Sequence, residues 1–227
     1  MKIRSFFLFL IIILCFISQA DSVGAQGNPI IFLNETSHAF PTVFEGEKLS
    51  HTFTIFNKGK ADLNIKKVTH TWGCSAARYD RVVPPGGKGV ITIEIDSNSV
   101  RGKFEKKVII WTNDLERRSV ALYLTGEVKP HIALEPGSYL SLWGDKNQVV
   151  KDHLEIINNH ESALKILSID TDLADQIRWH LKEITPGFKY RLEVEDISKT
   201  GKEYMGHLFI KTDNPQKPEL SIIVNRH

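Results

Sequence analysis

Apolar and polar residues alternate along most of the chain, in five short runs between residues 53 and 124 and five more between 154 and 224. A period of two places every second side chain on one face, so each run predicts a strand with one buried face. The predicted buried positions are Phe53, Ile55, Leu63, Ile65, Ile91, Ile93, Ile95, Val108, Ile110, Val120, Leu122 and Leu124, then Leu154, Ile156, Leu164, Ile166, Leu192, Val194, Leu208, Ile210, Leu220, Ile222 and Val224.

Turn-forming residues separate these runs. The turn signals are Asn57-Lys58-Gly59, Pro84-Pro85-Gly86-Gly87, Asn113-Asp114, Pro186-Gly187 and Asp213-Asn214-Pro215. No long helical pattern competes with them, and helical turns are expected only around 71–80 and 172–176. Short strands of alternating pattern with such turns are typical of an antiparallel β-sandwich.

The pattern occurs twice. A shift of 101 residues places Ile31 on Ile132 and Asn57 on Asn158, and each repeat has the size of an immunoglobulin-like domain. The predicted fold is therefore all-β, with two tandem immunoglobulin-like antiparallel β-sandwich domains after an N-terminal signal peptide. The expected boundaries are 1–25 for the signal peptide, 28–128 for the first domain and 129–227 for the second, diverged domain.

Residues 1–25 are typical of a secretory signal peptide. Lys2 and Arg4 precede an apolar block at 6–17, which small residues follow, and the block is shorter than the ~20 residues of a membrane-spanning helix. Cleavage after Ala20 or Ala25 is expected to leave no transmembrane span. The protein is therefore expected to be exported to the periplasm, the cell surface or the exterior.

Charge and cysteine content narrow the class further. The chain has 29 Lys and Arg against 27 Asp and Glu, and this balance argues against a nucleic-acid binder. A hydrophobic content of 41% argues against intrinsic disorder. Cys15 lies in the expected leader, so Cys74 alone remains and no internal disulfide is expected.

Several short motifs follow one another in the first repeat. They are Asn57-Lys58-Gly59, Gly73-Cys74-Ser75, Pro84-Pro85-Gly86, Gly102-Lys103-Phe104, Thr112-Asn113-Asp114 and Leu122-Tyr123-Leu124-Thr125-Gly126. This repeat resembles the bacterial domain of unknown function 1573 family, and the resemblance implies an exported immunoglobulin-like domain with no assigned reaction. The second repeat looks like a diverged member. Where the family resembles a Cys-Gly-Cys-Thr pattern, this sequence has Trp72-Gly73-Cys74-Ser75, with tryptophan in place of the first cysteine. The chemistry of a cysteine pair is therefore not carried over to this chain.

His70 and Cys74 are the weak candidates for metal or redox chemistry, because residues four apart share a face if this segment is helical. A closed zinc site needs four ligands, and no partner pair is evident in the sequence. A buried cysteine beside an exposed histidine is the favoured interpretation. A weak metal site, an intermolecular disulfide and a redox-sensing thiol remain alternatives, and no cofactor is expected.

Enzyme motifs are absent from the sequence, so we expect no catalytic site. The pairs Glu94/Asp96 and Glu193/Glu195 are interpreted as solvated outer faces of strands. The polar pairs at 113–114 and 213–214 are interpreted as turns rather than as calcium ligands.

The candidate binding residues are Trp72, Trp111, Lys103, Arg117 and Arg118. We expect Trp111 to be the most exposed tryptophan, and the basic residues of this hairpin either protect a sheet edge or bind an anionic polymer. The leading hypothesis is a non-enzymatic exported module of the bacterial envelope that binds another envelope or secreted protein. Its alternative is a small metal- or redox-handling protein that uses Cys74 with His70. A third hypothesis is carbohydrate binding through Trp111 or Trp72.

Overall fold

The computed structural model describes residues 27–145, 148–198 and 201–227 of the chain. The expected signal peptide, with Cys15 and both expected cleavage sites, lies outside the described residues. Within the described ranges, no helix has the length and apolar character that a membrane span requires.

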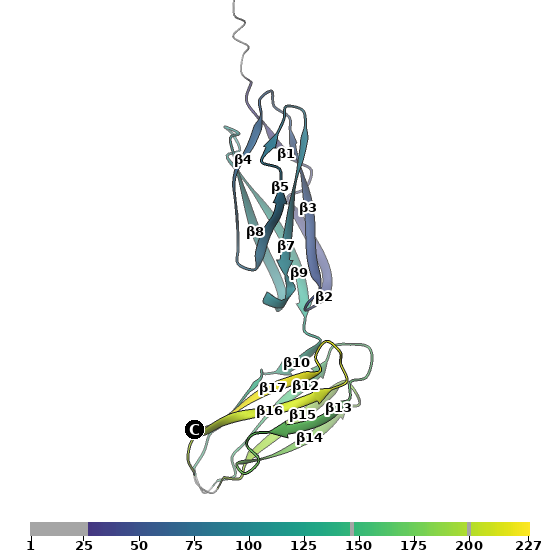
Figure 1. The fold of residues 1–227 in the computed structure, drawn as a ribbon, viewed down its shortest axis with the longest axis vertical. Helices are drawn as coiled ribbons and strands as arrows, with labels where there is room; N and C mark the ends of the chain where they lie inside the picture. The colour runs from purple at the N-terminus through teal and green to yellow at the C-terminus, as the bar shows by residue number, and fades with distance from the viewer. Residues whose placement is uncertain (1–26, 146–147, 199–200) are drawn as a thin grey trace, which may run out of the picture. The chain divides into compact units, whose positions relative to one another are not determined.

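Residues 27–129 form nine strands in two sheets, drawn in purple to teal in Figure 1. One sheet has the order β1-β3-β7-β5 and the other the order β2-β9-β8-β4-β6, with a short 3-10 helix at Ser97–Ser99. The strands are β1 (Ile31–Leu33), β2 (Ser37–Phe44), β3 (Lys48–Asn57), β4 (Leu63–His70), β5 (Cys74–Tyr79), β6 (Val82–Val83), β7 (Lys88–Asp96), β8 (Gly102–Thr112) and β9 (Ser119–Lys129).

The described residues after 129 form eight strands in two further sheets, drawn in green to yellow in Figure 1. Their orders are β10-β12-β15-β14 and β11-β17-β16-β13. The strands are β10 (Ile132–Glu135), β11 (Tyr139–Leu142), β12 (Lys151–Asn158), β13 (Ile166–Thr171), β14 (Ile177–Thr185), β15 (Lys189–Asp196), β16 (Tyr204–Thr212) and β17 (Glu219–Arg226). The fold of two tandem immunoglobulin-like sandwiches is confirmed, whereas the exact boundaries 28–128 and 129–227 stay a prediction.

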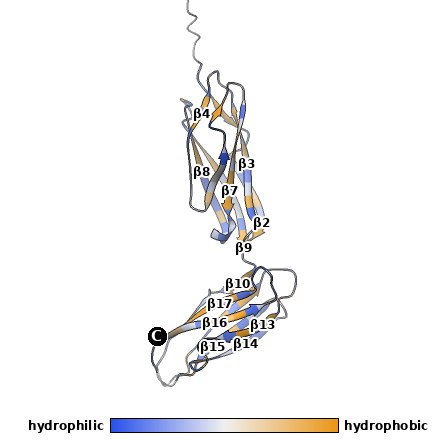
Figure 2. Cartoon of the chain, in the orientation of Figure 1, coloured by the Kyte–Doolittle hydropathy of each residue, from blue (hydrophilic) through white to orange (hydrophobic). Residues whose placement is uncertain are grey.

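Period-two alternation produces both cores. Hydrophobic and hydrophilic residues alternate along several strands in Figure 2, as they do along β3 and β16. All predicted core positions are buried except Ile166, which is half-buried and packs against the core of the second sandwich. One buried face per strand therefore identifies a large part of each core, and further buried residues such as Leu49, Leu140 and Leu142 lie outside the predicted runs.

The helical turn expected at 71–80 is wrong. Gly73 adopts a φ of 80° in a turn that ends β4, and the chain returns from it as strand β5, which joins the sheet through β7. A positive φ suits glycine and interrupts a right-handed helix, so this segment reverses direction instead. Near 172–176 the chain forms one hydrogen-bonded turn, in which Ile177 N–H donates to the carbonyl of Leu173 at 3.0 Å.

The pairing of β11 with β17 departs from the expected antiparallel arrangement. Strand β11 pairs in parallel with β17, with Tyr139 opposite Ile223 and Leu142 opposite Arg226. The chain from β10 to β11 passes from one sheet of the second sandwich to the other, and β1 and β2 divide in the same way between the sheets of the first. In both sandwiches, the first two strands therefore lie in different sheets, and the segment between them connects the sheets.

Candidate functional site

The tryptophans of the first sandwich occupy different settings. Trp72 lies in the turn between β4 and β5 with 77% of its surface exposed, and Trp111 lies on β8 with 42% exposed. Trp111 was expected to be the most exposed tryptophan, but Trp72 and also Trp143, at 68%, exceed it. Part of the Trp111 indole is covered by a neighbouring strand, because its Nε1–H donates to Thr69 Oγ1 on β4 at 3.5 Å.

Trp111 belongs to a polar and aromatic surface on the outer side of one sheet. Val108 and Ile110 of β8 point into the core, so the alternating Lys107 and Trp111 point outward. Lys67 lies opposite Trp111 on β4. On β9, the Tyr123 ring has its centroid 5.7 Å from Lys107 Nζ. We call Lys67, Thr69, Lys107, Trp111 and Tyr123 the outer β4–β8–β9 face.

The three basic candidates do not form one patch. Lys103 lies at the start of β8, whereas Arg117 and Arg118 lie in the turn that follows its end at Thr112. Thr112 lies nine positions after Lys103 along the strand, which amounts to ~30 Å at a rise of ~3.3 Å per residue. Arg117 and Arg118 are therefore the basic candidates that lie at the Trp111 end of the strand.

His70 and Cys74 lie on two strands rather than on one helical turn. Exposed His70 ends β4, and its Nδ1 lies 3.3 Å from the carbonyl oxygen of Thr71. Cys74 begins β5 and is only 8% exposed, with its Sγ 4.0 Å from Thr71 Oγ1. Neither residue belongs to a group of three potential metal ligands in the part of the chain that the structure describes. Their metal or redox role stays a prediction.

The structure instead brings together Glu35, His38 and His51, which sequence reasoning missed. One donor atom from each side chain lies within 4.8 Å of the others. His51 Nε2 is 2.9 Å from Glu35 Oε1. The His38 and His51 rings stack with their centroids 3.6 Å apart and their planes 10° apart.

Three consecutive segments of both sheets place this cluster. Glu35 follows β1, His38 lies on β2 and His51 lies on β3. His51 lies two residues from each of the buried Leu49 and Phe53, so it shares the inward side of β3 with them, and its ring meets the Phe53 ring edge-on at 4.7 Å. Because β2 belongs to the opposite sheet, His38 and His51 approach each other from the two layers of the sandwich.

The cluster is partly open to solvent. The His51 side chain is 20% exposed and that of Glu35 is 46% exposed. Burial lowers the pKa of His38, the neighbouring His51 lowers it further, and Glu35 acts in the opposite direction. His51 lies thirteen positions after His38, and no motif marks the three residues, so only the arrangement of the strands reveals the cluster.

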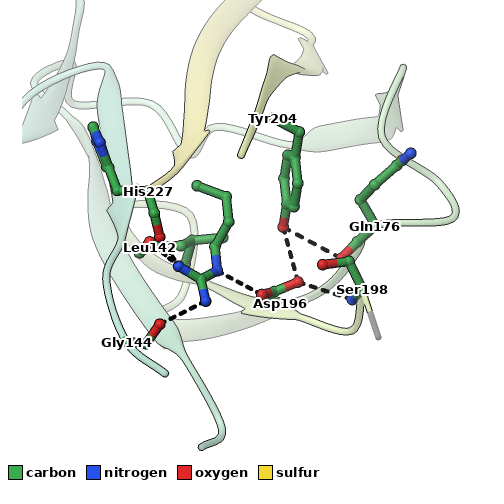
Figure 3. Close-up of polar contacts among 8 residues, drawn as sticks. Leu142, Gly144, Gln176, Asp196, Ser198, Tyr204 and His227 are labelled. Atoms are coloured by element: carbon green, nitrogen blue, oxygen red, sulfur yellow. Dashed lines mark hydrogen bonds and ion pairs between the residues drawn. The ribbon is translucent and has the colours of Figure 1, made fainter. Parts of the chain in front are cut away.

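A second polar cluster closes one end of the second sandwich and is shown in Figure 3. Buried Arg226 donates from Nε to Asp196 Oδ2 at 2.7 Å and from its terminal nitrogens to the carbonyls of Leu142, at 3.3 Å, and Gly144, at 2.7 Å. The Tyr204 hydroxyl donates to Asp196 Oδ1 at 3.1 Å. These bonds tie β17 to neighbouring segments, so we interpret the cluster as structural.

The pKa values in this cluster follow from burial and hydrogen bonding. Burial acts to raise the pKa of Asp196, but hydrogen bonds from Ser198, Arg226 and Tyr204 outweigh it, and the pKa lies below its usual value. Burial and the adjacent Asp196 charge raise the pKa of Tyr204. Asp196 is therefore the ionised partner of Arg226, and Tyr204 stays a neutral donor.

Comparisons with known proteins address the fold. Residues 31–128 match the family described as "Protein of unknown function (DUF1573)". A search of curated proteins returned no match.

Solved structures similar to this chain share little sequence with it. A protein of unknown function from Porphyromonas gingivalis W83 is 14% identical with a TM-score of 0.37, over 87% of this chain and 99% of that one. The ASH/PapD-like domain 7 of human CEP192 is 14% identical with a TM-score of 0.37, over 45% and 87%. A tandem pair of titin immunoglobulin domains is 10% identical with a TM-score of 0.32, over 88% and 97%.

Proposed function

We propose, on the premise that residues 31–128 belong to this family of unknown function, that the protein is a non-enzymatic, exported interaction module of the bacterial envelope. The observation that carries the proposal is the outer β4–β8–β9 face, on which Trp111 and Tyr123 are exposed beside Lys67 and Lys107. Export rests on the leader-like pattern of residues 1–25.

The chemistry of this face fits a protein partner. Tryptophan and tyrosine supply large contact areas at interfaces, and they lose little conformational entropy when they become fixed. Lysines beside them favour a partner surface that combines apolar side chains with carboxylates. The outer β4–β8–β9 face is therefore the surface that we assign to binding.

The acidic pair Glu193/Glu195 supports a role other than catalysis. Lys151 Nζ lies 2.9 Å from Glu193 Oε1 and 3.3 Å from Glu195 Oε2, on the outer side of β15. Carboxylates engaged in surface ion pairs are suited to solubility rather than to acid–base chemistry.

The experiment is a cross-linking pull-down of the protein from cells that produce it, with wild type, Trp111→Ala and Trp179→Ala compared. Trp179 is the matched control, because it is a similarly exposed tryptophan on β14 of the second sandwich. We expect a specific partner that Trp111→Ala loses and Trp179→Ala keeps. Equal capture by all three proteins would contradict the assignment of the outer β4–β8–β9 face.

The same pull-down tests the alternatives. It is repeated with reductant and with Cys74→Ser, and loss of the partner under either condition would make the thiol the functional centre. A glycan panel monitored by tryptophan fluorescence tests carbohydrate binding through Trp72 or Trp111.

A further inference from the structure

We propose that Glu35, His38 and His51 form a binding site for a divalent transition-metal ion, Zn²⁺ or Cu²⁺. Two imidazole nitrogens and one carboxylate oxygen would hold the ion, and water would complete the coordination. Imidazole is the protein ligand that both ions favour, and three protein ligands with one open position are typical of an accessible zinc site. The proposal goes beyond protein binding by the outer β4–β8–β9 face.

The donor atoms are already close to the required separation. Zinc bonds to histidine nitrogen and carboxylate oxygen are ~2.0–2.2 Å long, so two donors at a tetrahedral angle lie ~3.3 Å apart. Glu35 Oε1 and His51 Nε2 are 2.9 Å apart, and the three donor atoms lie within 4.8 Å of one another. The His38 and His51 rings stack nearly parallel, whereas an imidazole binds a metal in its ring plane, so the His38 ring would have to rotate out of the stack for both nitrogens to face one ion.

The backbone holds the three residues in place. Strands β1 and β3 pair with Leu33 opposite Ile55, which fixes the segment before Glu35 against the strand that carries His51. Contact with the buried Phe53 ring orients the imidazole of His51. A site assembled on paired strands loses little entropy when it binds an ion.

The proposed site is open to solvent on the side of Glu35. Glu35 is half-exposed, so its carboxylate gives an ion a path from water to the two imidazoles, which lie deeper between the sheets. The competing explanation is that ring stacking and one His–Glu hydrogen bond only stabilise this edge of the sandwich. The two explanations differ in whether the full set of three donors binds one ion.

The test is calorimetric titration of the purified full chain with Zn²⁺ and separately with Cu²⁺, with Mg²⁺ as the hard-cation reference. We expect one ion of at least one transition metal per chain and no binding of Mg²⁺. His51→Gln, His38→Gln and Glu35→Gln should each raise the dissociation constant at least about tenfold. The matched control is His207→Gln in the second sandwich, where His207 Nδ1 lies 3.3 Å from Asp172 Oδ2 as an isolated pair.

Two results would overturn the site. One is the absence of saturable 1:1 binding to the folded wild-type chain, and the other is binding that persists in all three variants or disappears in His207→Gln. Circular dichroism checks folding, and if a histidine variant unfolds, the variant of exposed Glu35 decides. As a second readout, the His38 and His51 ring signals in the nuclear magnetic resonance spectrum should shift together on adding Zn²⁺, whereas the His207 signal should not.

Discussion

At the scale of single residues, one buried asparagine closes the same turn in each sandwich. The side-chain amide of Asn57 donates to the carbonyls of Ala61 and Val83 at 2.8 and 2.9 Å, and its oxygen accepts from the N–H groups of Ile30 and Gly59 at 3.2 and 3.0 Å. Every polar atom of this buried side chain therefore has a partner, which is the condition under which a buried amide stabilises a fold.

The equivalent Asn158 makes corresponding bonds in the second sandwich. Its amide donates to the carbonyls of Ser162 and Gly187 at 2.6 and 3.0 Å, and its oxygen accepts from His160 N–H at 3.1 Å. The agreement between two positions 101 residues apart shows that the repeat extends to side-chain geometry.

Asn57→Ala is expected to lower the free energy of unfolding by about 2–4 kcal/mol, because it removes four hydrogen bonds, of which the one to the Val83 carbonyl is buried. Urea denaturation measures the loss. Exposed Asn98→Ala is the control and should change the free energy of unfolding by less than ~0.5 kcal/mol. An Asn57→Ala protein as stable as this control would contradict a structural role for the amide.

Asp114 links stability to pH. Burial acts to raise its pKa, but hydrogen bonds from the backbone N–H groups of Ile31, Arg117 and Glu116, together with the charge of Arg117, hold the pKa below its usual value. A carboxyl group with a lowered folded-state pKa adds stability above the unfolded-state pKa of ~3.9 and loses that contribution as the pH falls through its folded-state value.

Asp114→Asn tests this link, since asparagine already occupies the equivalent position as Asn214 and accepts from Gln216 and Lys217 N–H. The amide cannot accept on both sides, so we expect a loss of about 1–3 kcal/mol at pH 7. The difference from wild type should shrink below about pH 4, as measured by urea denaturation from pH 7 to pH 3. A difference that is constant with pH would exclude the charge of Asp114 as its cause.

At the scale of elements, close contact of a strand with a turn creates a requirement for glycine. A Cβ atom on Gly206 of β16 would lie 2.4 Å from Asp172 Oδ1 and 2.5 Å from Leu173 Cγ. The same turn is fixed by Asp172, whose Oδ1 accepts from His207 N–H at 2.6 Å. The strand and the turn therefore depend on each other.

Gly206→Ala is expected to lower the free energy of unfolding by about 1–3 kcal/mol, because the 172–173 turn must move away from the strand. Thermal denaturation measures the effect. Gly137→Ala is the matched control, because a Cβ there has no neighbour within 4 Å. Equal stability of the two variants would show that the turn moves without cost.

The sequence predicts elements well where alternation is strong and poorly where it is weak. The runs at Ile91, Ile93 and Ile95 and at Val120, Leu122 and Leu124 are strands with those side chains buried. The segment Cys74-Ser75-Ala76-Ala77-Arg78-Tyr79 has no such alternation, so pairing with β7, rather than its own pattern, makes it a strand.

The metal-ligand cluster was beyond sequence reasoning for a related reason. His38 and His51 meet only because consecutive strands lie in opposite sheets, and a one-dimensional pattern does not contain that arrangement. His70 and Cys74 drew attention instead because their spacing fits a helix, which the glycine turn at 73 prevents.

At the scale of the whole molecule, each sandwich has its own sheets and its own core. We expect calorimetry to resolve two unfolding transitions. Asn57→Ala should lower the midpoint temperature of the first sandwich's transition only. Asp196→Asn should lower that of the second sandwich only, with a loss of about 3–5 kcal/mol in its free energy of unfolding, since it leaves the buried guanidinium of Arg226 without its counter-charge. A single transition that both variants shift would show that the sandwiches unfold as one unit.

Reducing agent is expected to leave the melting temperature unchanged, because Cys74 is the only cysteine in residues 26–227 and no intramolecular disulfide can form there. Thermal scans with and without reductant check this. A large decrease with reductant would instead show that Cys74 pairs between two chains.

The parallel pairing of β11 with β17 has a mechanical consequence. The chain enters the second sandwich ahead of β11 and leaves it after β17, so tension on these two sides pulls the paired strands lengthwise in opposite directions. The hydrogen bonds between them are then loaded in shear and resist together, whereas pulling apart the antiparallel β16–β17 pair from adjacent strand ends would break its bonds one after another. Single-molecule stretching should therefore require more force between residues 138 and 227 than between 204 and 227. If both ends of the protein were anchored in an envelope under tension, the β11–β17 pairing would keep the second sandwich folded.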